Sequence, residues 1–428
     1  MKYKQEDAHI PVYDSLVYDS LLYDSKEENM NNMSNTKRIL ALIAIFVSTI
    51  AVMADLAITP VIGMIYGAYP DNMGAVNYIV SGPMLIVVVV SLLTPYLFRF
   101  MDKKLVFIIA SIIFAIGAIG GVAVNTPGFI CFTRTLVGIG EGAINVVGVS
   151  YIADLYESQE IRSRISGYYN SALSLAGMVL SYVAGNLATD GNWTSVYKVY
   201  WVAIPIAILI ILFIPSVKPD ASAAAVKKTS TGKKEPLGWR FIYMNICWFV
   251  VNLVLGASIL YYLSSYIFEF GLGDSSFSGT ATAVKSVCGI LVGLVYGNIV
   301  AGLKRFTPTV TFAVAAVGML IMLAAPATWT VLIIGTITGL TYKVWFSYSY
   351  GHGWEIVPAS RVDDAVSIST AVYGLGSFAC TYFYSFIAGA LKTESIVPVW
   401  YVCIGILAVL FVVDLIVISI EKKQFPAG

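Results

Sequence analysis

Twelve long apolar stretches occupy most of this 428-residue chain, and a lysine-rich polar break after the sixth divides them into two sets of six. A helix of about 20 apolar residues is long enough to span the hydrocarbon core of a bilayer. A helix also satisfies its own backbone hydrogen bonds, as lipid requires. The pattern therefore predicts an all-α integral membrane protein with twelve transmembrane helices in two pseudo-symmetric six-helix bundles.

Composition agrees with this prediction. Hydrophobic residues make up 58% of the chain and charged residues only 12%, whereas a soluble domain has roughly 25% charged residues. A membrane β-barrel is excluded because its strands would show short alternating segments. The predicted spans are residues 39–67, 76–98, 105–124, 128–153, 167–188, 196–215, 239–266, 277–303, 308–325, 329–350, 366–388 and 398–420.

The chain divides into four predicted parts. Residues 1–36 form a polar tail with a repeated Tyr-Asp-Ser motif, and residues 216–238 form a linker between bundles at 37–215 and 239–423. The five-residue period of the tail fits neither a helix nor a strand. We therefore expect a disordered cytoplasmic tail, with a docking or regulatory role as the alternative.

The distribution of lysine and arginine predicts the orientation in the membrane. With the N-terminus inside, 21 of the 26 lysine and arginine residues lie in cytoplasmic segments and two lie outside. Basic residues concentrate on the cytoplasmic side of membrane proteins. We expect a multi-pass protein of the cytoplasmic (cell) membrane with both termini inside. We see no cleaved signal peptide, and the net charge of +1 does not suggest nucleic acid as a partner.

Several charged side chains lie inside the predicted spans. Arg134, Glu141 and Asn145 in the fourth span are spaced by seven and four residues, so they share one helical face. Asp55 lies deep in the first span, next to Pro60. Charges at this depth are costly toward lipid and normally face a protein interior or a water-filled path. The structural alternatives are an arginine bonded to carbonyls and a hydrogen-bonded aspartate.

Two lysines are buried in the second set of spans. Lys285 lies in the eighth span and Lys343 in the tenth, each on a face that also carries glycines. Snorkelling of the side chain toward the membrane surface is the alternative for both, and close helix packing can explain the glycines. The aromatic residues near Lys343, including Tyr342 and Trp345, can form the apolar wall of a binding site.

Three features make the chain resemble the major facilitator superfamily over about residues 39–423. They are the six-plus-six layout, the Arg134…Gly138-x-Gly140 pattern, and the Asp154…Arg162-x-Arg164 segment with its echo Glu355…Arg361. The resemblance implies the major facilitator fold, with a solute path between the two bundles.

The chain also departs from the pattern of that superfamily. The loop between the second and third spans keeps its basic residues but lacks the aspartate and glycines of the signature motif. The glycine-proline pair of the antiporter motif in the fifth span is replaced by Ser181-Tyr182. The second departure weakens an assignment to drug efflux.

The buried charges and the resemblance together assign roles to particular residues. The predicted substrate-binding residues are Arg134, Asn145, Lys285, Tyr342, Lys343 and Trp345. The predicted proton-coupling residues are Asp55 and Glu141. The predicted gating loops contain Arg99, Lys103, Lys104, Asp154, Arg162, Arg164, Glu355 and Arg361.

These assignments favour a secondary transporter for a small organic solute. The predicted lining of the solute path holds three cations and two carboxylates, so we expect an anionic or zwitterionic substrate. We expect this substrate to be moved by proton-coupled symport through alternating access. Proton-coupled multidrug efflux is the first alternative, sodium is the alternative coupling ion, and a membrane sensor is the third hypothesis. The sequence has no phosphate loop, catalytic triad or metal-spaced cluster. We therefore expect no enzymatic activity, catalytic residues, metal or cofactor. We also expect a monomer in the lipid bilayer.

Overall fold

The computed structural model describes residues 33–98, 100–156, 158–216, 236–358 and 361–424. Within these ranges all regular secondary structure is helical. The repeats of the predicted tail and most of the predicted linker lie outside the described residues.

The helices of the first half are α2 (Asn35–Val52), α3 (Ile62–Ala68), α4 (Met73–Leu97), α5 (Lys103–Gly120), α6 (Pro127–Leu155), α7 (Gln159–Leu187) and α8 (Ala203–Phe213). The helices of the second half are α10 (Trp239–Val251), α11 (Ala257–Glu269), α12 (Ser275–Leu303), α13 (Thr307–Ala324), α14 (Thr328–Glu355), α15 (Val362–Leu391) and α16 (Val397–Gln424).

The described helices account for the twelve predicted spans. Ten stretches are long and apolar enough to cross a membrane. The remaining two spans are α7 and α12, each 29 residues long. Three spans are irregular: α2 and α3 share the first, a ten-residue 3₁₀ segment (Trp193–Val202) precedes α8 in the sixth, and a π-helical turn joins α10 to α11 in the seventh.

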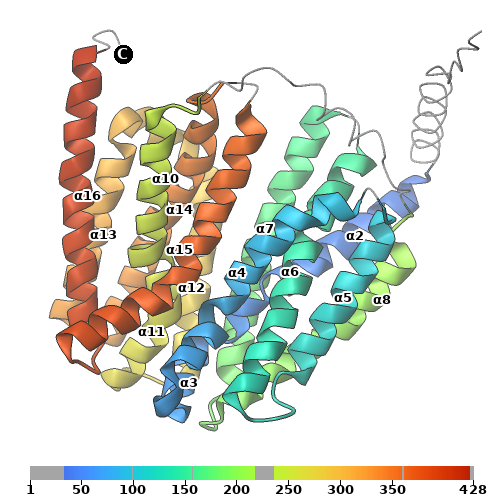
Figure 1. Ribbon diagram of the computed structural model, residues 1–428, viewed down its shortest axis with the longest axis horizontal. Coiled ribbons are helices and arrows are strands. Elements are labelled where there is room, and N and C mark those ends of the chain that lie inside the picture. Colours follow the sequence, from blue (N-terminus) through green and yellow to red (C-terminus); the bar gives the residue numbers. More distant parts are fainter. Residues whose placement is uncertain (1–32, 99, 157, 217–235, 359–360, 425–428) are drawn as a thin grey trace, which may run out of the picture.

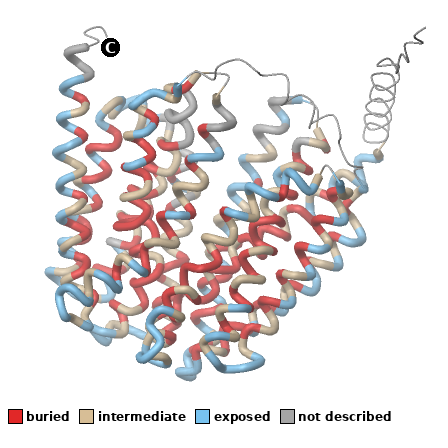
Figure 2. The backbone as a smooth tube through the Cα atoms, in the orientation of Figure 1, coloured by how far each residue is buried: buried red, intermediate tan, exposed pale blue. Residues whose placement is uncertain are grey.

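The helices form two bundles, α2–α8 and α10–α16, that lie side by side (Figure 1). They meet where α4 packs on α15, α7 on α12, and α3 on α11. Figure 2 shows that buried residues fill the interior of the bundles and the region where they meet, while exposed residues cover the outward faces. This arrangement confirms the predicted all-α fold of two six-helix bundles.

The two ends of the molecule differ in how the bundles contact each other. We call the end with the turns at 100–102 and 304–306 the linker end, and the end with the turns at 121–126 and 270–274 the far end. In Figure 1 the linker end is at the top, where the ribbons of the two bundles diverge, and the far end is at the bottom, where they converge.

Neutral side chains join the bundles in the half of the molecule next to the far end. Asn77 of α4 donates to the hydroxyl of Ser385 at 2.7 Å. The hydroxyls of Ser81 and Thr381 are 2.7 Å apart. The Ser275 hydroxyl donates to the carbonyl oxygen of Gly185 at 2.8 Å. The bundles are therefore held together here by neutral hydrogen bonds between small polar groups.

A pair of glycines allows α7 and α12 to approach closely at this end. A Cβ atom on Gly185 would lie 2.4 Å from the carbonyl oxygen of Ser275, and one on Gly279 would lie 2.5 Å from the carbonyl oxygen of Ser181. Small residues permit such backbone contacts between membrane helices. The contact between the bundles therefore depends on the absence of a side chain at both positions.

We predict that Gly279→Ala destabilises the protein relative to Gly302→Ala. Both changes add one methyl group to a glycine of α12, but a Cβ atom on Gly302 meets nothing within 4 Å. Overpacking costs about 1–3 kcal/mol, whereas alanine alone favours a helix. Unfolding of the detergent-solubilised variants measures the difference, and equal stability of the two variants would contradict the close contact.

Candidate functional site

The first span is broken where it carries its carboxylate. Two short 3₁₀ segments occupy residues 54–61 between α2 and α3. Pro60 has no N–H group, so the carbonyl oxygen of Leu56 loses its helical donor. This oxygen accepts instead from the hydroxyl of Thr59 at 2.8 Å and from that of Ser181 at 3.3 Å. The break is thus stabilised by polar side chains.

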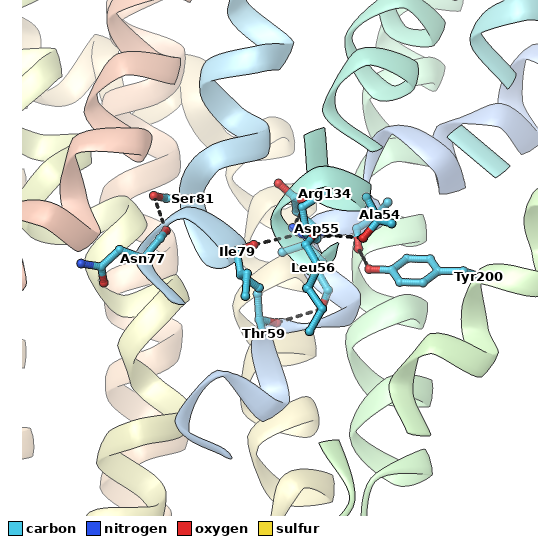
Figure 3. Close-up of polar contacts among 11 residues, drawn as sticks. Ala54, Asp55, Leu56, Thr59, Asn77, Ile79, Ser81, Arg134 and Tyr200 are labelled. Atoms are coloured by element: carbon cyan, nitrogen blue, oxygen red, sulfur yellow. Dashed lines mark hydrogen bonds and ion pairs between the residues drawn. The ribbon is translucent and has the colours of Figure 1, made fainter. Parts of the chain in front are cut away.

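Asp55 sits inside this break and is only 5% exposed. The preceding carbonyl oxygen, that of Ala54, accepts a hydrogen bond from the buried Tyr200 hydroxyl at 3.0 Å (Figure 3). The sixth span therefore holds the backbone next to the aspartate in place.

Arg134 connects this break to a second proline-induced defect. Pro83 lies within α4 and leaves the carbonyl oxygen of Ile79 without its helical donor. The Nε of Arg134 donates to this oxygen at 2.9 Å, and its Nη2 donates to Oδ1 of Asp55 at 2.5 Å (Figure 3). One buried guanidinium of α6 thereby contacts both the broken first span and the kinked second span.

Glu141 completes what we call the acid cluster, defined as Asp55, Arg134 and Glu141. Glu141 is 3% exposed and lies two turns after Arg134 on the same helix, α6. Three enclosed atoms have no hydrogen-bond partner among the described residues: Oδ2 of Asp55, Nη1 of Arg134 and Oε2 of Glu141. Two carboxylates and one guanidinium have a net charge of −1 when all are ionised, and one added proton makes the cluster neutral.

The second bundle has its own helix defect. The π-helical turn Asn252–Gly256 joins α10 and α11, and such turns are rare and frequent at functional sites. The Nζ of Lys285 donates to the carbonyl oxygen of Gly256 at 3.1 Å and lies 5.8 Å from the centroid of the Tyr342 ring. The lysine of α12 is thus anchored on a backbone irregularity.

Asn252 organises the surroundings of this turn and is a residue that the sequence analysis missed. Its Nδ2 donates to the carbonyl oxygen of Tyr373 at 2.5 Å and to the Ser377 hydroxyl at 2.7 Å. Its Oδ1 accepts from the Tyr342 hydroxyl at 3.0 Å. The Trp248 ring stacks on Tyr342 and on Tyr373, with centroids 5.7 and 5.9 Å apart. An asparagine at bilayer depth is itself a signal that could have identified this residue.

Lys343 lies next to Lys285 on the adjacent helix. A Cβ atom on Gly339, one turn before Lys343, would be 3.1 Å from Cγ of Lys285. Nζ of Lys285 lies 5.8 Å from the centroid of the Tyr342 ring, next to Lys343 in the chain, and Nζ of Lys343 lies 5.4 Å from the centroid of the Phe346 ring. We call Lys285 and Lys343 the lysine pair. The structure thus brings together two cations that the sequence placed on different spans.

The two remaining predicted substrate residues, Asn145 and Trp345, make no hydrogen bond or ring contact with the charged side chains of the acid cluster or the lysine pair among the described residues. Asn145 accepts from the hydroxyl of Tyr169 at 3.1 Å, which links α6 to α7. Trp345 is 2% exposed and packs edge-on against Phe312 and Trp248. Their predicted roles in binding, like those of the other site residues, stay predictions.

An ion pair of the predicted gating loops lies within the first bundle. Lys103 forms an ion pair with Asp154 at 2.6 Å and donates to the Ser150 hydroxyl at 2.7 Å. Arg361 immediately precedes α15. The helices run further than predicted, because Arg162 and Arg164 lie in α7, Glu355 is the last residue of α14, and Lys103 and Lys104 begin α5. Arg99 lies outside the described residues.

Comparisons with known proteins agree with this architecture. The family model of the Major Facilitator Superfamily matches residues 40–381. A D-xylose-proton symporter has a similar structure, with a TM-score of 0.66, 18% identity, and coverage of 87% of this chain and 96% of the symporter. A peptide transporter has a TM-score of 0.70 and 11% identity, over 88% of this chain and 94% of the transporter.

A bacterial homologue of the human lysosomal transporter Spinster, in an inward-facing and unoccupied conformation, has a TM-score of 0.67 and 14% identity. The structural match covers 96% of that homologue and 91% of this chain. Among curated proteins, the efflux pump hmp6 of Hypomyces subiculosus is 27% identical over 242 residues. That alignment covers 54% of this chain and 41% of the pump.

We predict that single substitutions in the Asp55–Arg134 pair are more destabilising than the double substitution. Removing one partner leaves the other charge buried and unpaired, which costs about 3–5 kcal/mol, whereas apolar replacement of both is often nearly neutral. Unfolding of Asp55→Leu, Arg134→Met and the double variant forms a double-mutant cycle. Additive losses in that cycle would refute the direct pairing of these two side chains.

Proposed function

This chain belongs to the major facilitator superfamily, and from this premise we propose that it is a proton-coupled transporter of a small organic anion or zwitterion. It carries the solute across the cytoplasmic membrane by alternating access, with both termini in the cytoplasm. The orientation rests on the sequence, in which 21 of the 26 lysine and arginine residues fall in segments predicted to be cytoplasmic.

The observation that carries the proposal is the separation of charge between the two bundles. The acid cluster belongs entirely to the first bundle, and the lysine pair belongs entirely to the second. Buried charges at membrane depth mark solute paths and proton relays. A cluster that changes its net charge with one proton, opposite a cationic site for the solute, has the two parts that coupled transport requires.

Within this proposal Glu141 is the group that gains and loses the transported proton. Asp55 already accepts a hydrogen bond from Arg134, whereas Glu141 accepts none from the described residues. Protonation of Glu141 would therefore break no hydrogen bond in the described structure. We propose Asp55 as the second coupling carboxylate, acting through its pairing with Arg134.

The hydrogen bonds near the far end fit alternating access. Asn77 with Ser385 and Ser81 with Thr381 join the two bundles on the side that we place outside the cell. Rocking of one bundle against the other would break these neutral contacts when the path opens outward. The structure therefore supports a state that is closed on the outer side.

The second candidate function is proton-coupled multidrug efflux. The similarity to the efflux pump of Hypomyces subiculosus favours it. Ser181 and Tyr182 in place of the antiporter glycine-proline pair favour symport. Competition by hydrophobic cations rather than by organic acids in a flux assay would select the efflux candidate. Dependence on sodium rather than on protons would change the coupling ion.

We predict that Glu141→Gln abolishes solute-driven proton movement but retains solute exchange, because glutamine keeps the shape of the side chain and cannot titrate. Purified protein in proteoliposomes with a lumenal pH dye, challenged with organic acids and amino acids, measures this. The signal of the variant should fall to the protein-free background. The control is Glu394→Gln, an exposed residue after α15, which should behave like wild type. A wild-type proton signal from Glu141→Gln would refute its role in coupling.

A further inference from the structure

The lysine pair has more positive charge and more hydrogen-bond donors than its surroundings use. An ammonium group has three donors, and Lys285 uses one of them on the carbonyl oxygen of Gly256. Lys343 donates no hydrogen bond to any described residue, and its described contact is the ring of Phe346. Two donors on Lys285 and three on Lys343 therefore make no hydrogen bond to the described residues.

Neither lysine has an acidic partner within the described part of the chain. The ion pairs found there join Lys103 to Asp154 and Arg134 to Asp55, both in the first bundle. Two like charges that repel each other at bilayer depth are unfavourable unless an anion compensates them. The pair thus has a charge of +2 that the described protein leaves uncompensated when both lysines are ionised.

The position of the pair points to a solute and not to a lipid headgroup. The Phe346 ring beneath Lys343 packs edge-on against Trp248 of α10 and Tyr373 of α15. Lys285 lies against the π-helical turn and the Tyr342 ring. Both ammonium groups therefore lie against rings of α14 that pack on residues of α10 and α15. Aromatic faces in such a place stabilise a cation and limit its contact with water.

We propose that the lysine pair binds a dianion, a small solute with two acid groups such as a dicarboxylate. This inference rests on the proposed function and specifies its substrate class. A monoanion would leave one lysine uncompensated, and a zwitterion would bring its own ammonium group toward a second cation. A dianion places one acid group on each lysine, and the rings of Tyr342 and Phe346 provide the apolar surface for the carbon skeleton between them.

The test measures binding to the full-length purified protein by thermal shift. The probes are succinate, its monoamide succinamate, and butyrate, which share a four-carbon skeleton and differ in charge. Inorganic phosphate and sulfate test whether charge alone is sufficient without a carbon skeleton. We expect succinate to bind at least about tenfold more tightly than the other two organic probes, because an unpaired buried charge in such a site is costly.

Substitutions in the lysine pair test whether it causes the preference for succinate. Lys285→Met and Lys343→Met should each remove the advantage of succinate over succinamate, and Lys343→Arg should keep it because the charge remains. The matched control is Lys198→Met, at an exposed lysine of the first bundle, which should leave the preference unchanged. If Lys285→Met fails to fold, the Lys343 variants alone decide the outcome.

Several results would overturn the inference. These are equal binding of succinate and succinamate, failure of every dianion to bind wild-type protein, or a preference that persists in Lys343→Met. In any of these cases, proton movement driven by another organic anion or zwitterion would still support the proposed function. Conversely, dianion binding that depends on both lysines, without any coupled proton flux, would support this inference while refuting the proposed coupling.

Discussion

In a membrane, a backbone carbonyl that loses its helical donor must find another donor within the protein. This constraint governs the centre of the first bundle. Pro60 and Pro83 each remove a donor, and the oxygens of Leu56 and Ile79 are satisfied by Thr59, Ser181 and Arg134. The guanidinium of Arg134 donates to the free carbonyl oxygen of the second span and also to the carboxylate of the first span. The same residue therefore contributes to stability and fixes the position of a charge.

The second bundle also bonds a cation to the backbone, at a different kind of helix defect. Its π-helical turn ends at Gly256, and the carbonyl oxygen of Gly256 accepts a hydrogen bond from the ammonium group of Lys285. The absence of a side chain at Gly256 is necessary, because a Cβ atom there would lie 2.2 Å from the Tyr342 ring. Each bundle thus holds a cation at bilayer depth by bonding it to a backbone carbonyl at a helix irregularity, but only the cation of the first bundle is also paired with a carboxylate.

Much of the fold could be predicted from the sequence, because lipid imposes long apolar spans and excludes the alternatives. The burial of Asp55, Arg134 and Glu141 also followed from their position in those spans. The hydrogen-bond partners of these side chains could not be predicted in the same way. The carbonyl that Pro83 leaves without a donor, that of Ile79, follows from the local sequence, but its contact with Arg134 depends on how α4 packs on α6, which is not local in sequence. The π-helical turn was missed because Asn252–Gly256 fits an uninterrupted apolar span, and its satisfied hydrogen bonds come from α14 and α15.

The contacts between the bundles differ in kind from the contacts within them. Inside the bundles, Asp55 is paired with Arg134, and Arg134 and Lys285 bond to backbone carbonyls. Breaking a buried ion pair is costly. Between the bundles, the described hydrogen bonds join hydroxyls, amides and backbone groups, such as Gly63 with Ser264 and Ser81 with Thr381. Such bonds in a membrane contribute on average only about 0.6 kcal/mol each. A few of them can close one side of a path and still be broken in each cycle, which a set of buried ion pairs could not allow. The strong interactions within each bundle therefore preserve it as a rigid body, and the weak hydrogen bonds between the bundles let the two bundles move.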